Sequence, residues 1–428
     1  MTKEKRNGEY FIGQTQSKTR LRRGILTSDV DRKVFVVLTA VFIVMLGVGI
    51  IGPILPRYAR SFGVSYSIAG LTISGFGIAR ILFDVPCGFL CDRFGRRPII
   101  IIGMLVYSFA GLPAAYASSI VHLILSRFIQ GAGAAMFTTS AMAYVADLSP
   151  TDKRGKYLGY YQGTFFLGTA VGPALGGLLT GVGGIRMPFL LLSALALLGA
   201  GFVYGSLPEL HLDLSQHSIR RISISSVISG MLSTRVAILA NLSAAVTFLV
   251  TSGIRFTAIP IFGQGSLGLD DFEIGVILSV SALLTFLLVK WSGALVDKIG
   301  GLASLFYGFL SSGIIVALFA LTRDFASMLV VGGILGASIS LLVPAQAALA
   351  VDVSNPNHRG LSLGIYRIFS DIGIITGPII AGVASDTFAL SFSFYVIAGI
   401  CIATAATIAV AGGIKKKNFH SYKRTNSG

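Results

Sequence analysis

The sequence has little charge, and this shortage decides the class of protein. Charged residues make up 12% of the 428-residue chain, hydrophobic residues make up 54%, and the mean hydropathy is +0.80. A soluble domain has about 25% charged residues, because water must solvate its surface. This chain has too few charges to cover a water-facing surface of its size, so lipid must be part of its solvent.

Cysteine and histidine are also scarce, and no cofactor motif takes their place. Three cysteines, Cys87, Cys91 and Cys401, lie in apolar runs or at their ends, which excludes an extracellular disulfide framework. The five histidines are scattered. A dinucleotide-like glycine pattern at 47–52 lies inside an apolar run, and no phosphate-binding loop of the ATPase type occurs. We therefore expect no metal, no cofactor and no enzymatic activity.

Twelve apolar runs fill most of the chain. A helix that crosses roughly 30 Å of hydrocarbon needs about 20 apolar residues. Lipid accommodates only helices or closed barrels, and runs of this length exclude strands. The runs lie near residues 34–56, 66–89, 98–117, 119–146, 157–181, 187–207, 236–262, 272–295, 302–322, 325–351, 361–384 and 388–413, with the briefest breaks at Ser118 and Arg323. The sequence therefore predicts an all-α integral membrane protein with twelve transmembrane helices.

Lysine and arginine exceed the acids by 34 to 18, and their placement predicts the orientation of the chain. Most of these cations lie in the tails and in alternate loops, whereas the opposite side has only Arg57, Arg60, Arg186 and Arg323. Cationic loops remain in the cytoplasm. We expect a cell-membrane protein with both termini cytoplasmic. An excess that is spread over tails and short loops does not indicate nucleic-acid binding.

An internal repeat divides the chain into two similar halves. Gly88-Phe-Leu-Cys-Asp92-Arg-Phe-Gly95 recurs 205 residues later as Gly293-Ala-Leu-Val-Asp297-Lys-Ile-Gly300. The same displacement relates Asp147 to Asp352 and Gly172-Pro173 to Gly377-Pro378. The repeat predicts six-helix bundles at 34–207 and 236–413, joined by a cytoplasmic linker at 208–235 and flanked by cytoplasmic tails at 1–33 and 414–428. Two similar bodies can rock about a central site, as in many transporters.

The first copy of the repeat carries a family signature. Gly88-x-Leu90-x-Asp92-Arg93-x-Gly95-Arg96-Arg97-Pro98 resembles the loop between helices 2 and 3 of the major facilitator superfamily. The resemblance implies that Asp92 latches the two halves near the start of helix 11 and that Arg97 pairs with Asp147. The expected gating latch comprises Gly88, Asp92, Arg93, Gly95, Arg96, Arg97, Asp147 and Asp297. A basic loop that only sets the topology is the alternative.

Charged residues within the spans are candidates for proton coupling. Arg127 with Gln130 resembles the arginine segment of proton-coupled members, although an arginine that reaches the outer interface would look the same. Arg80 and Asp84 are four residues apart, as are Arg367 and Asp371, so each pair shares a helix face and can form an ion pair. A buried acid can carry a proton, but an adjacent arginine favours a permanent ion pair. Both readings stay open.

The fifth span carries a glycine-rich segment that resembles that of exporters and antiporters in the superfamily. Its residues are Gly168, Gly172, Pro173, Gly176 and Gly177. Small residues of this kind let helices 5 and 8 pack closely, and an ordinary packing face is the alternative. The resemblance also implies that helices 1, 4, 7 and 10 surround a cavity. Candidate residues of its wall are Asn241, Arg255, Gln130 and Gln346.

Together these features predict a secondary transporter that works by alternating access, resembling the twelve-span drug:proton antiporter group. The expected activity is proton-coupled efflux of small hydrophobic or amphipathic compounds, by a monomer in the lipid bilayer with protons as the coupling ion. One alternative is an importer or facilitator of a small metabolite with the same fold. Another is a sensor or scaffold that moves no substrate.

Overall fold

The computed structural model describes residues 30–150, 153–209, 234–352 and 359–412, without the side chains of Asp92, residues 350–352 and residues 359–366. Over these ranges the elements are helical, and twelve helices are long and apolar enough to cross a membrane. The predicted fold class is therefore confirmed. The spans are Val30–Ile51, α3 (Tyr66–Phe94), α4 (Arg96–Ala115), α5 (Ile120–Leu148), α6 (Arg154–Gly183), α7 (Met187–Ser206), α9 (Arg235–Val250) with η1 (Thr251–Ala258) and α10 (Ile259–Leu267), α11 (Asp271–Ile299), α12 (Gly301–Phe319), α13 (Phe325–Asp352), α14 (Arg359–Thr387) and α15 (Phe392–Ala411).

Polar and glycine residues mark the ends of these helices. Ser65 and Ser119 accept hydrogen bonds from the first turns of α3 and α5, and these side-chain caps fix where the helices begin. Gly95 (φ 91°) and Gly300 (φ 88°), which the repeat relates, form the turns after α3 and α11 in a conformation that favours glycine. The helix ends differ from the predicted ones by up to five residues. The first span also ends early, at Ile51, and a short helix α2 (Leu55–Arg60) follows it.

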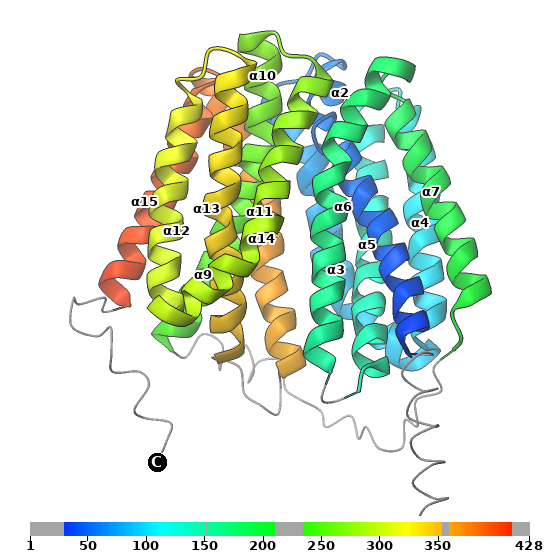
Figure 1. The fold of residues 1–428 in the computed structure, drawn as a ribbon. Helices are drawn as coiled ribbons and strands as arrows, with labels where there is room; N and C mark the ends of the chain where they lie inside the picture. Colours follow the sequence, from blue (N-terminus) through cyan, green and yellow to red (C-terminus); the bar gives the residue numbers. More distant parts are fainter. Residues whose placement is uncertain (1–29, 151–152, 210–233, 353–358, 413–428) are drawn as a thin grey trace, which may run out of the picture.

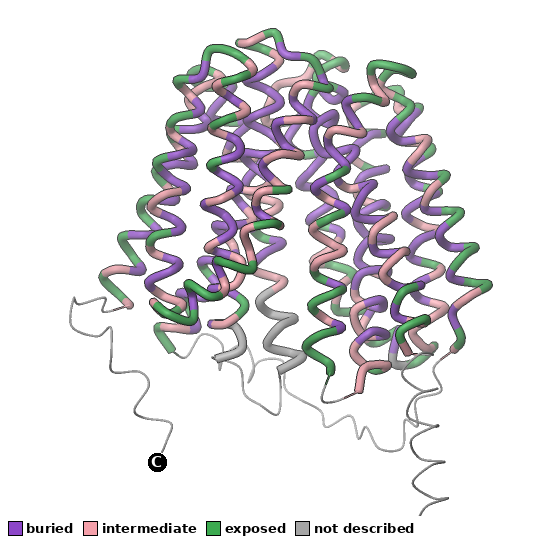
Figure 2. The backbone as a smooth tube through the Cα atoms, viewed as in Figure 1, coloured by how far each residue is buried: buried purple, intermediate pink, exposed green. Residues whose placement is uncertain are grey.

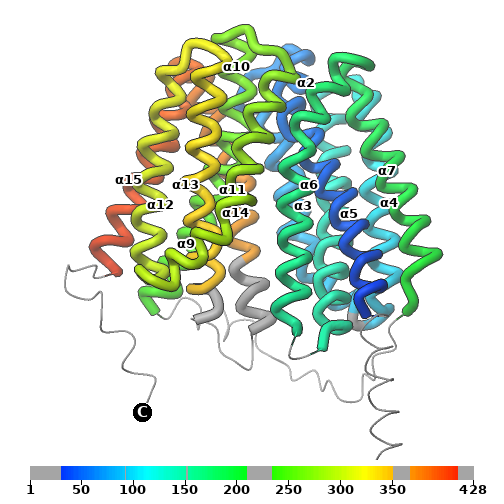
Figure 3. The backbone as a smooth tube through the Cα atoms, viewed as in Figure 1, coloured from blue at the N-terminus to red at the C-terminus, as the bar shows by residue number. Residues whose placement is uncertain are grey.

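The helices stand side by side in two groups (Figure 1). Helices up to α7 lie on one side and those from α9 onward on the other, and the tube in Figure 3 follows the same order. Each group has its own apolar core, one drawn from residues between Val34 and Leu207 and the other from residues between Leu239 and Ile408. Figure 2 shows exposed segments along the outer flanks, which is where a membrane protein meets lipid.

The two groups meet mainly through two helix pairs, α3 with α14 and α6 with α11, and the short helix α2 adds smaller contacts with η1 and α10. The described chain begins at Val30 and ends at 412 on the same face of the molecule (Figure 1), which we call the terminal face; the opposite face is the distal face. Towards the distal face the backbones touch. A Cβ at Gly70 would meet the Pro378 carbonyl, and a Cβ at Gly177 would meet the backbone of Asp271.

Towards the terminal face the same helix stripes have no such contact. Gly88 is on the α3 stripe of Gly70, and Gly159 is on the α6 stripe of Gly177, eighteen residues or five turns away. A Cβ added at Gly88 or at Gly159 would meet no atom of the described residues within 4 Å. Among the described residues, the halves are therefore closed together at the distal face and separate along these two stripes towards the terminal face.

Candidate functional site

A cluster of charged side chains lies where α3 meets α14. The Arg80 Nε is 3.1 Å from the Asp371 Oδ1, and the Arg80 NH2 is 4.0 Å from the Asp84 Oδ2. The Asp371 side chain is only 2% exposed and the Arg80 side chain 11% exposed. Because α3 and α14 belong to different halves, the ion pair between Arg80 and Asp371 joins the two bodies inside the membrane-spanning region.

Neighbouring groups complete this cluster. Thr139 donates a hydrogen bond to the Asp84 Oδ1 (3.0 Å), and the Asp84 carboxyl group also interacts with that of Asp371. Arg367 donates to the Thr138 hydroxyl at 3.4 Å. Two acids and two arginines thus share one site that is largely shielded from water. In such a site the gain or loss of one proton has its largest effect on the electrostatic energy.

Of the two ion pairs that the helical spacing allows, the structure shows the one between Arg80 and Asp84, and it adds a pair between helices that the sequence did not predict. Arg367 and Asp371 share a helix face, but Asp371 takes its ion-pair partner from α3 rather than from its own helix. The pair of Arg80 and Asp84 is present, although at the longer distance of 4.0 Å. Spacing along one helix identifies residues that can meet, whereas packing between helices decides which of them do.

Arg127 forms a second buried cationic site, within the first half. Its NH1 donates to the Gln130 Oε1 at 2.6 Å, and its guanidinium lies 4.6 Å from the centre of the Phe76 ring. Arg127 is 4% exposed, so protein groups rather than the lipid interface surround it. The amide oxygen and the aromatic face both stabilise the buried charge.

The glycine-rich segment of α6 serves two contacts. Gly168, Gly172 and Gly176, each four residues apart, face the first span, where added Cβ atoms would meet backbone of that helix. Pro173 and Gly177 face α11, where a Cβ at Gly275 would meet the Pro173 carbonyl. The predicted approach of helices 5 and 8 thus involves one edge of the segment, and its other edge packs within the first half.

The signature loop lies at the terminal face, at the junction of α3 and α4. Arg96 pairs with Asp147 (3.1 Å), which corrects the predicted pairing of Arg97 with Asp147. Arg97 instead donates to the Tyr204 carbonyl at 2.6 Å and lies over the Tyr204 ring. Gly95 makes the turn that directs these two arginines to different neighbours.

The remaining latch residues lie apart. Arg93 is exposed beside the Phe94 ring, and Asp297 is exposed near the end of α11. Asp92 lies within α3, but its side chain falls outside the described residues, as do the first side chains of α14, its predicted partner. The latch therefore stays a prediction.

The four candidate wall residues are all buried in this conformation. Asn241 and Gln346 are each 1% exposed, Gln130 is fully buried, and Arg255 is 8% exposed. Gln346 donates to the Ser243 carbonyl and the Thr247 hydroxyl, so it fixes α13 against α9. Arg255 is the member of this set that carries a charge, and it lies in the π-helical segment η1.

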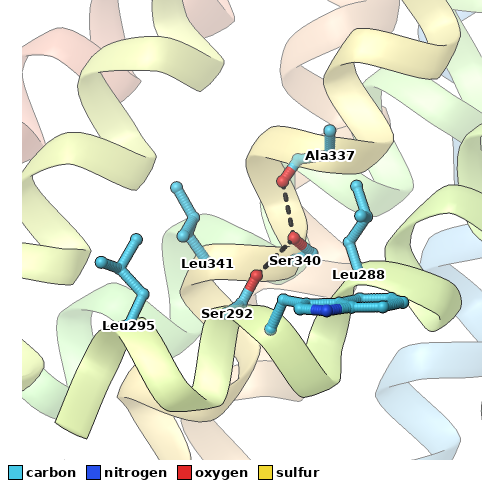
Figure 4. Close-up of a pocket in the computed structure, with 7 residues that line it drawn as sticks. Leu288, Ser292, Leu295, Ala337, Ser340 and Leu341 are labelled. Carbon is cyan, nitrogen blue, oxygen red and sulfur yellow. Dashed lines mark hydrogen bonds between the residues drawn. The ribbon is translucent and has the colours of Figure 1, made fainter. Parts of the chain in front are cut away.

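A pocket of about 230 Å³ lies between α11 and α13 (Figure 4). Leu288, Trp291, Ser292, Leu295, Ala337, Ser340 and Leu341 line it. Its two serines share a hydrogen bond of 2.8 Å, and Ser340 also donates to the Ala337 carbonyl. None of the residues predicted from the sequence lines this pocket, and its lining carries no charge.

Polar contacts close the distal face, and the sequence did not reveal them. Arg57 pairs with Asp271 (2.6 Å), whose other oxygen accepts a bond from Gln264 (2.7 Å). Asp386, near the end of α14, accepts hydrogen bonds of 2.8 Å from the backbone N–H groups of Tyr66 and Ser67. Tyr66 and Asp271 are the first residues of α3 and α11, and the 205-residue displacement relates them. The repeat therefore indicated that the starts of these two helices are equivalent contact points.

Replacing Asp386 with asparagine is expected to loosen the distal face. The carboxylate binds the positive end of α3 through two N–H groups, and an amide keeps at most part of that interaction. Asp386 is exposed, so the loss is about 1 kcal/mol, or about a fivefold shift towards the state open at the distal face. Spin-label distances between the α2–α3 and α14–α15 loops measure this shift.

Asp324→Asn is the matched control for this variant. Asp324 lies in another loop of the distal face, and it bonds only locally, to the backbone N–H of Ser327. Its substitution should leave the distance distribution unchanged. Equal shifts in both variants would contradict a latch role for Asp386.

A twelve-helix membrane protein with two similar halves, closed at one face and joined by a buried ion pair, has the architecture of an alternating-access transporter. The sequence model of the Major Facilitator Superfamily matches residues 37–331 and 244–421. The chain therefore belongs to this superfamily, as its signature loop implied. Membership makes it a multi-pass membrane transporter of small molecules.

Several relatives have names that refer to drug resistance. The chain is 26% identical over 360 residues to multidrug resistance protein 2 of Bacillus subtilis, with 83% of this chain and 90% of that protein covered. It is 22% identical over 383 residues to the quinolone resistance protein NorA of Staphylococcus aureus, covering 89% and 96% of the two chains. A solved bacterial homologue of the lysosomal transporter Spinster, inward-facing and unoccupied, shares the fold with a TM-score of 0.73 at 17% identity over 90% of this chain and 96% of that one.

Proposed function

We propose that this protein exports small hydrophobic or amphipathic compounds from the cytoplasm in exchange for protons. The observation that carries the proposal is the buried ion pair of Arg80 and Asp371, which joins the two halves beside the second acid Asp84. An acid at this contact between the halves, α3 with α14, can be protonated only when the two halves separate. Proton binding and the rocking motion therefore depend on each other.

The orientation of the protein follows from its charges. The terminal face is the cytoplasmic one in this proposal, because the loops on that face carry most of the lysine and arginine of the chain. The described conformation is then the one open to the cytoplasm, ready to accept a compound to be exported. The bundles 34–207 and 236–413 rock as two bodies, and the loop around Gly88–Arg97 latches the terminal face in the alternate state.

The driving force is adequate for export. One charge that crosses a membrane potential of 100 mV releases about 2.3 kcal/mol, and a tenfold proton gradient adds about 1.4 kcal/mol. Together these suffice for a concentration ratio of a few hundredfold. The names of the bacterial relatives, which refer to multidrug and quinolone resistance, support export as the direction of transport.

Transport in proteoliposomes tests this proposal. Purified protein is reconstituted as a monomer, and a panel of fluorescent amphipathic dyes is followed with an acidic lumen, an acidic exterior and no gradient. Antiport predicts that an acidic lumen drives dye into the vesicles and that a protonophore stops the uptake. Equal rates with and without a gradient would favour a facilitator or metabolite importer, and no flux under any gradient would favour a sensor or scaffold.

A further inference from the structure

Arg255 is a buried arginine in an unusual stretch of helix. The seventh span changes from α-helix to π-helix over Thr251–Ala258, and Arg255 lies in the middle of this segment. Short π-helical segments are rare and are found often at functional sites, because the wider turn redirects one side chain out of the regular helical series. Here the redirected side chain crosses from the seventh span to α11.

The guanidinium of Arg255 is only partly satisfied by protein. Its NH2 donates to the Thr285 hydroxyl (2.8 Å) and, more weakly, to the Ser281 carbonyl (3.3 Å). Its Nε is buried and makes no hydrogen bond, and the hydroxyl oxygen of Ser281, on the same helix turn, is also buried without a partner. A guanidinium has five N–H donors in a fork that fits a carboxylate or phosphate. The free donors therefore mark a place that an anionic group would fill.

No acid of the described residues forms an ion pair with Arg255. Two arginines that join the halves have acidic partners, Arg80 with Asp371 and Arg57 with Asp271, and the buried Arg127 has the amide of Gln130. A charge without a counter-ion inside the membrane is unfavourable even on the insertion scales that give it the smallest free-energy cost. When an arginine is retained inside the membrane despite this cost, the usual reason is a functional partner.

The position of Arg255 excludes a lipid headgroup as this partner. Arg255 is twelve residues from the distal end of the span at Leu267, or about 18 Å along the helix, and it is still farther from Arg235 at the other end. The side chain is also 8% exposed and surrounded by protein, so a headgroup has no direct access to it from the lipid. An anion that meets Arg255 must enter through the protein.

The terminal face offers a path for that entry. Ser281, Thr285 and Val289 are four residues apart and form one stripe of α11. The first two are buried, whereas Val289, one turn nearer the terminal face, is only half-buried. On α13, Gly336 accepts a bond from Thr285, and Val343, two turns nearer the terminal face, is again half-buried. The residues of both stripes thus become less buried towards the terminal face, where the two halves separate.

We propose that Arg255, with the hydroxyl groups of Ser281 and Thr285, binds the anionic group of amphipathic substrates that carry a carboxylate, sulfonate or phosphonate. The guanidinium supplies two parallel N–H donors and Ser281 an O–H donor. The apolar side chains of the half-buried stripe, beginning at Val289 and Val343, contact the body of the molecule. This inference rests on the proposed function for the statement that such molecules are cargo, but binding itself does not require proton coupling.

A matched series of ligands tests the site. Binding of 2-naphthoate, 2-naphthamide and 2-naphthylmethylammonium to the purified full-length protein is measured by calorimetry and by thermal shift. These ligands share one aromatic body and differ only in charge. The wild-type protein is expected to prefer naphthoate over both others. Arg255→Gln is expected to weaken naphthoate binding by about 10- to 100-fold, since a charge-assisted bidentate contact is lost, and to leave the other two ligands within about twofold.

Two further variants keep the test decisive. Arg255→Lys keeps the charge and loses the fork, so it should bind naphthoate with intermediate affinity even if the glutamine variant proves unstable. Arg323→Gln removes an exposed arginine of the distal face and should bind all three ligands as the wild type does. An Arg255→Gln protein that binds naphthoate normally, a parallel loss of all three ligands, or a wild type with no preference for naphthoate would each overturn the proposal.

The outcome is separable from that of the transport assay. Naphthoate binding that depends on Arg255, in a protein that moves no dye under any gradient, would support the anion site and reject proton-coupled export. Gradient-driven dye export that is unaltered by Arg255→Gln, together with unaltered naphthoate binding, would support export and reject the anion site.

Discussion

Replacing Asp371 with asparagine is expected to abolish pH-driven transport, with a loss of at least about 100-fold in the rate that depends on the proton gradient. The amide cannot take up or release a proton, so the seam of α3 and α14 would keep one charge state throughout the cycle. Movement of substrate down its own gradient should continue, because the halves remain able to rock. Dye flux in proteoliposomes, with and without an acidic lumen, measures both quantities.

Asp84→Asn is the comparison variant for this prediction. Asp84 also belongs to the cluster, but it lies 4.0 Å from Arg80 and its Oδ1 accepts a bond from Thr139. An amide can accept the same bond, so this variant should keep most of its coupled transport. Wild-type coupling in Asp371→Asn would assign the proton to another group, and equal losses in both variants would assign it to the pair of acids.

A purely structural role for the ion pair predicts a different result. Removing one partner of a buried pair leaves an uncompensated charge and commonly costs about 3–5 kcal/mol of stability, whereas removing both restores much of it. The double variant Arg80→Gln with Asp371→Asn therefore separates the two roles. If the pair only holds α3 to α14, the double variant should regain thermal stability and coupled transport together. If Asp371 carries the proton, stability should return and coupling should not.

The fold was largely predictable because few backbone conformations are stable in lipid. Each span needs about 20 apolar residues, so twelve such runs predict twelve helices, and the structure divides the chain even at the brief breaks of Ser118 and Arg323. The irregular stretches were not predictable. The kink at Gly52–Ile54 and the π-helix at Thr251–Ala258 depend on contacts with other helices, such as the approach of Phe256 to Gly52, which no periodic pattern encodes.

The candidate site was predictable in its residue types and not in its partners. A charge inside an apolar run stands out in any sequence, and Arg80, Asp84 and Asp371 were found in this way, whereas Arg127 and Arg255 also drew on the family resemblance. Their partners come from helices that are distant in sequence, as with Arg80 and Asp371. Polar residues in loops, such as Asp386, do not stand out at all, because a charge there needs no explanation.

The two seams between the halves, α3 with α14 and α6 with α11, have similar backbone packing but different side-chain chemistry. The displacement of 205 residues relates Arg80 to Thr285 and Asp84 to Val289, so the seam of α6 and α11 has no counterpart of the buried ion pair. One seam can therefore respond to protons while the other serves as the close-packed pivot. That division makes the packing of α6 on α11 as important for transport as the charged cluster itself.

Replacing Gly177 with valine is accordingly expected to reduce all transport, coupled or not, by at least about tenfold. A Cβ at this position would overlap the backbone of Asp271, the residue that also holds Arg57 at the distal face. Backbone atoms cannot move aside as a flexible side chain can, so α6 and α11 must separate and the distal face cannot close. The variant should still fold, because Gly177 lies between the two halves and outside the core of either.

Gly181→Val, one turn farther along α6, is the matched control, since a Cβ there would meet nothing within 4 Å. This variant should transport at the wild-type rate. Spin-label distances between the α2–α3 and α10–α11 loops should lengthen in Gly177→Val and stay unchanged in Gly181→Val. Normal transport by Gly177→Val would show that the close approach of the helices is dispensable. Loss of transport in both variants would point to a general intolerance of bulk in α6, and the pivot would then have to lie elsewhere on the seam.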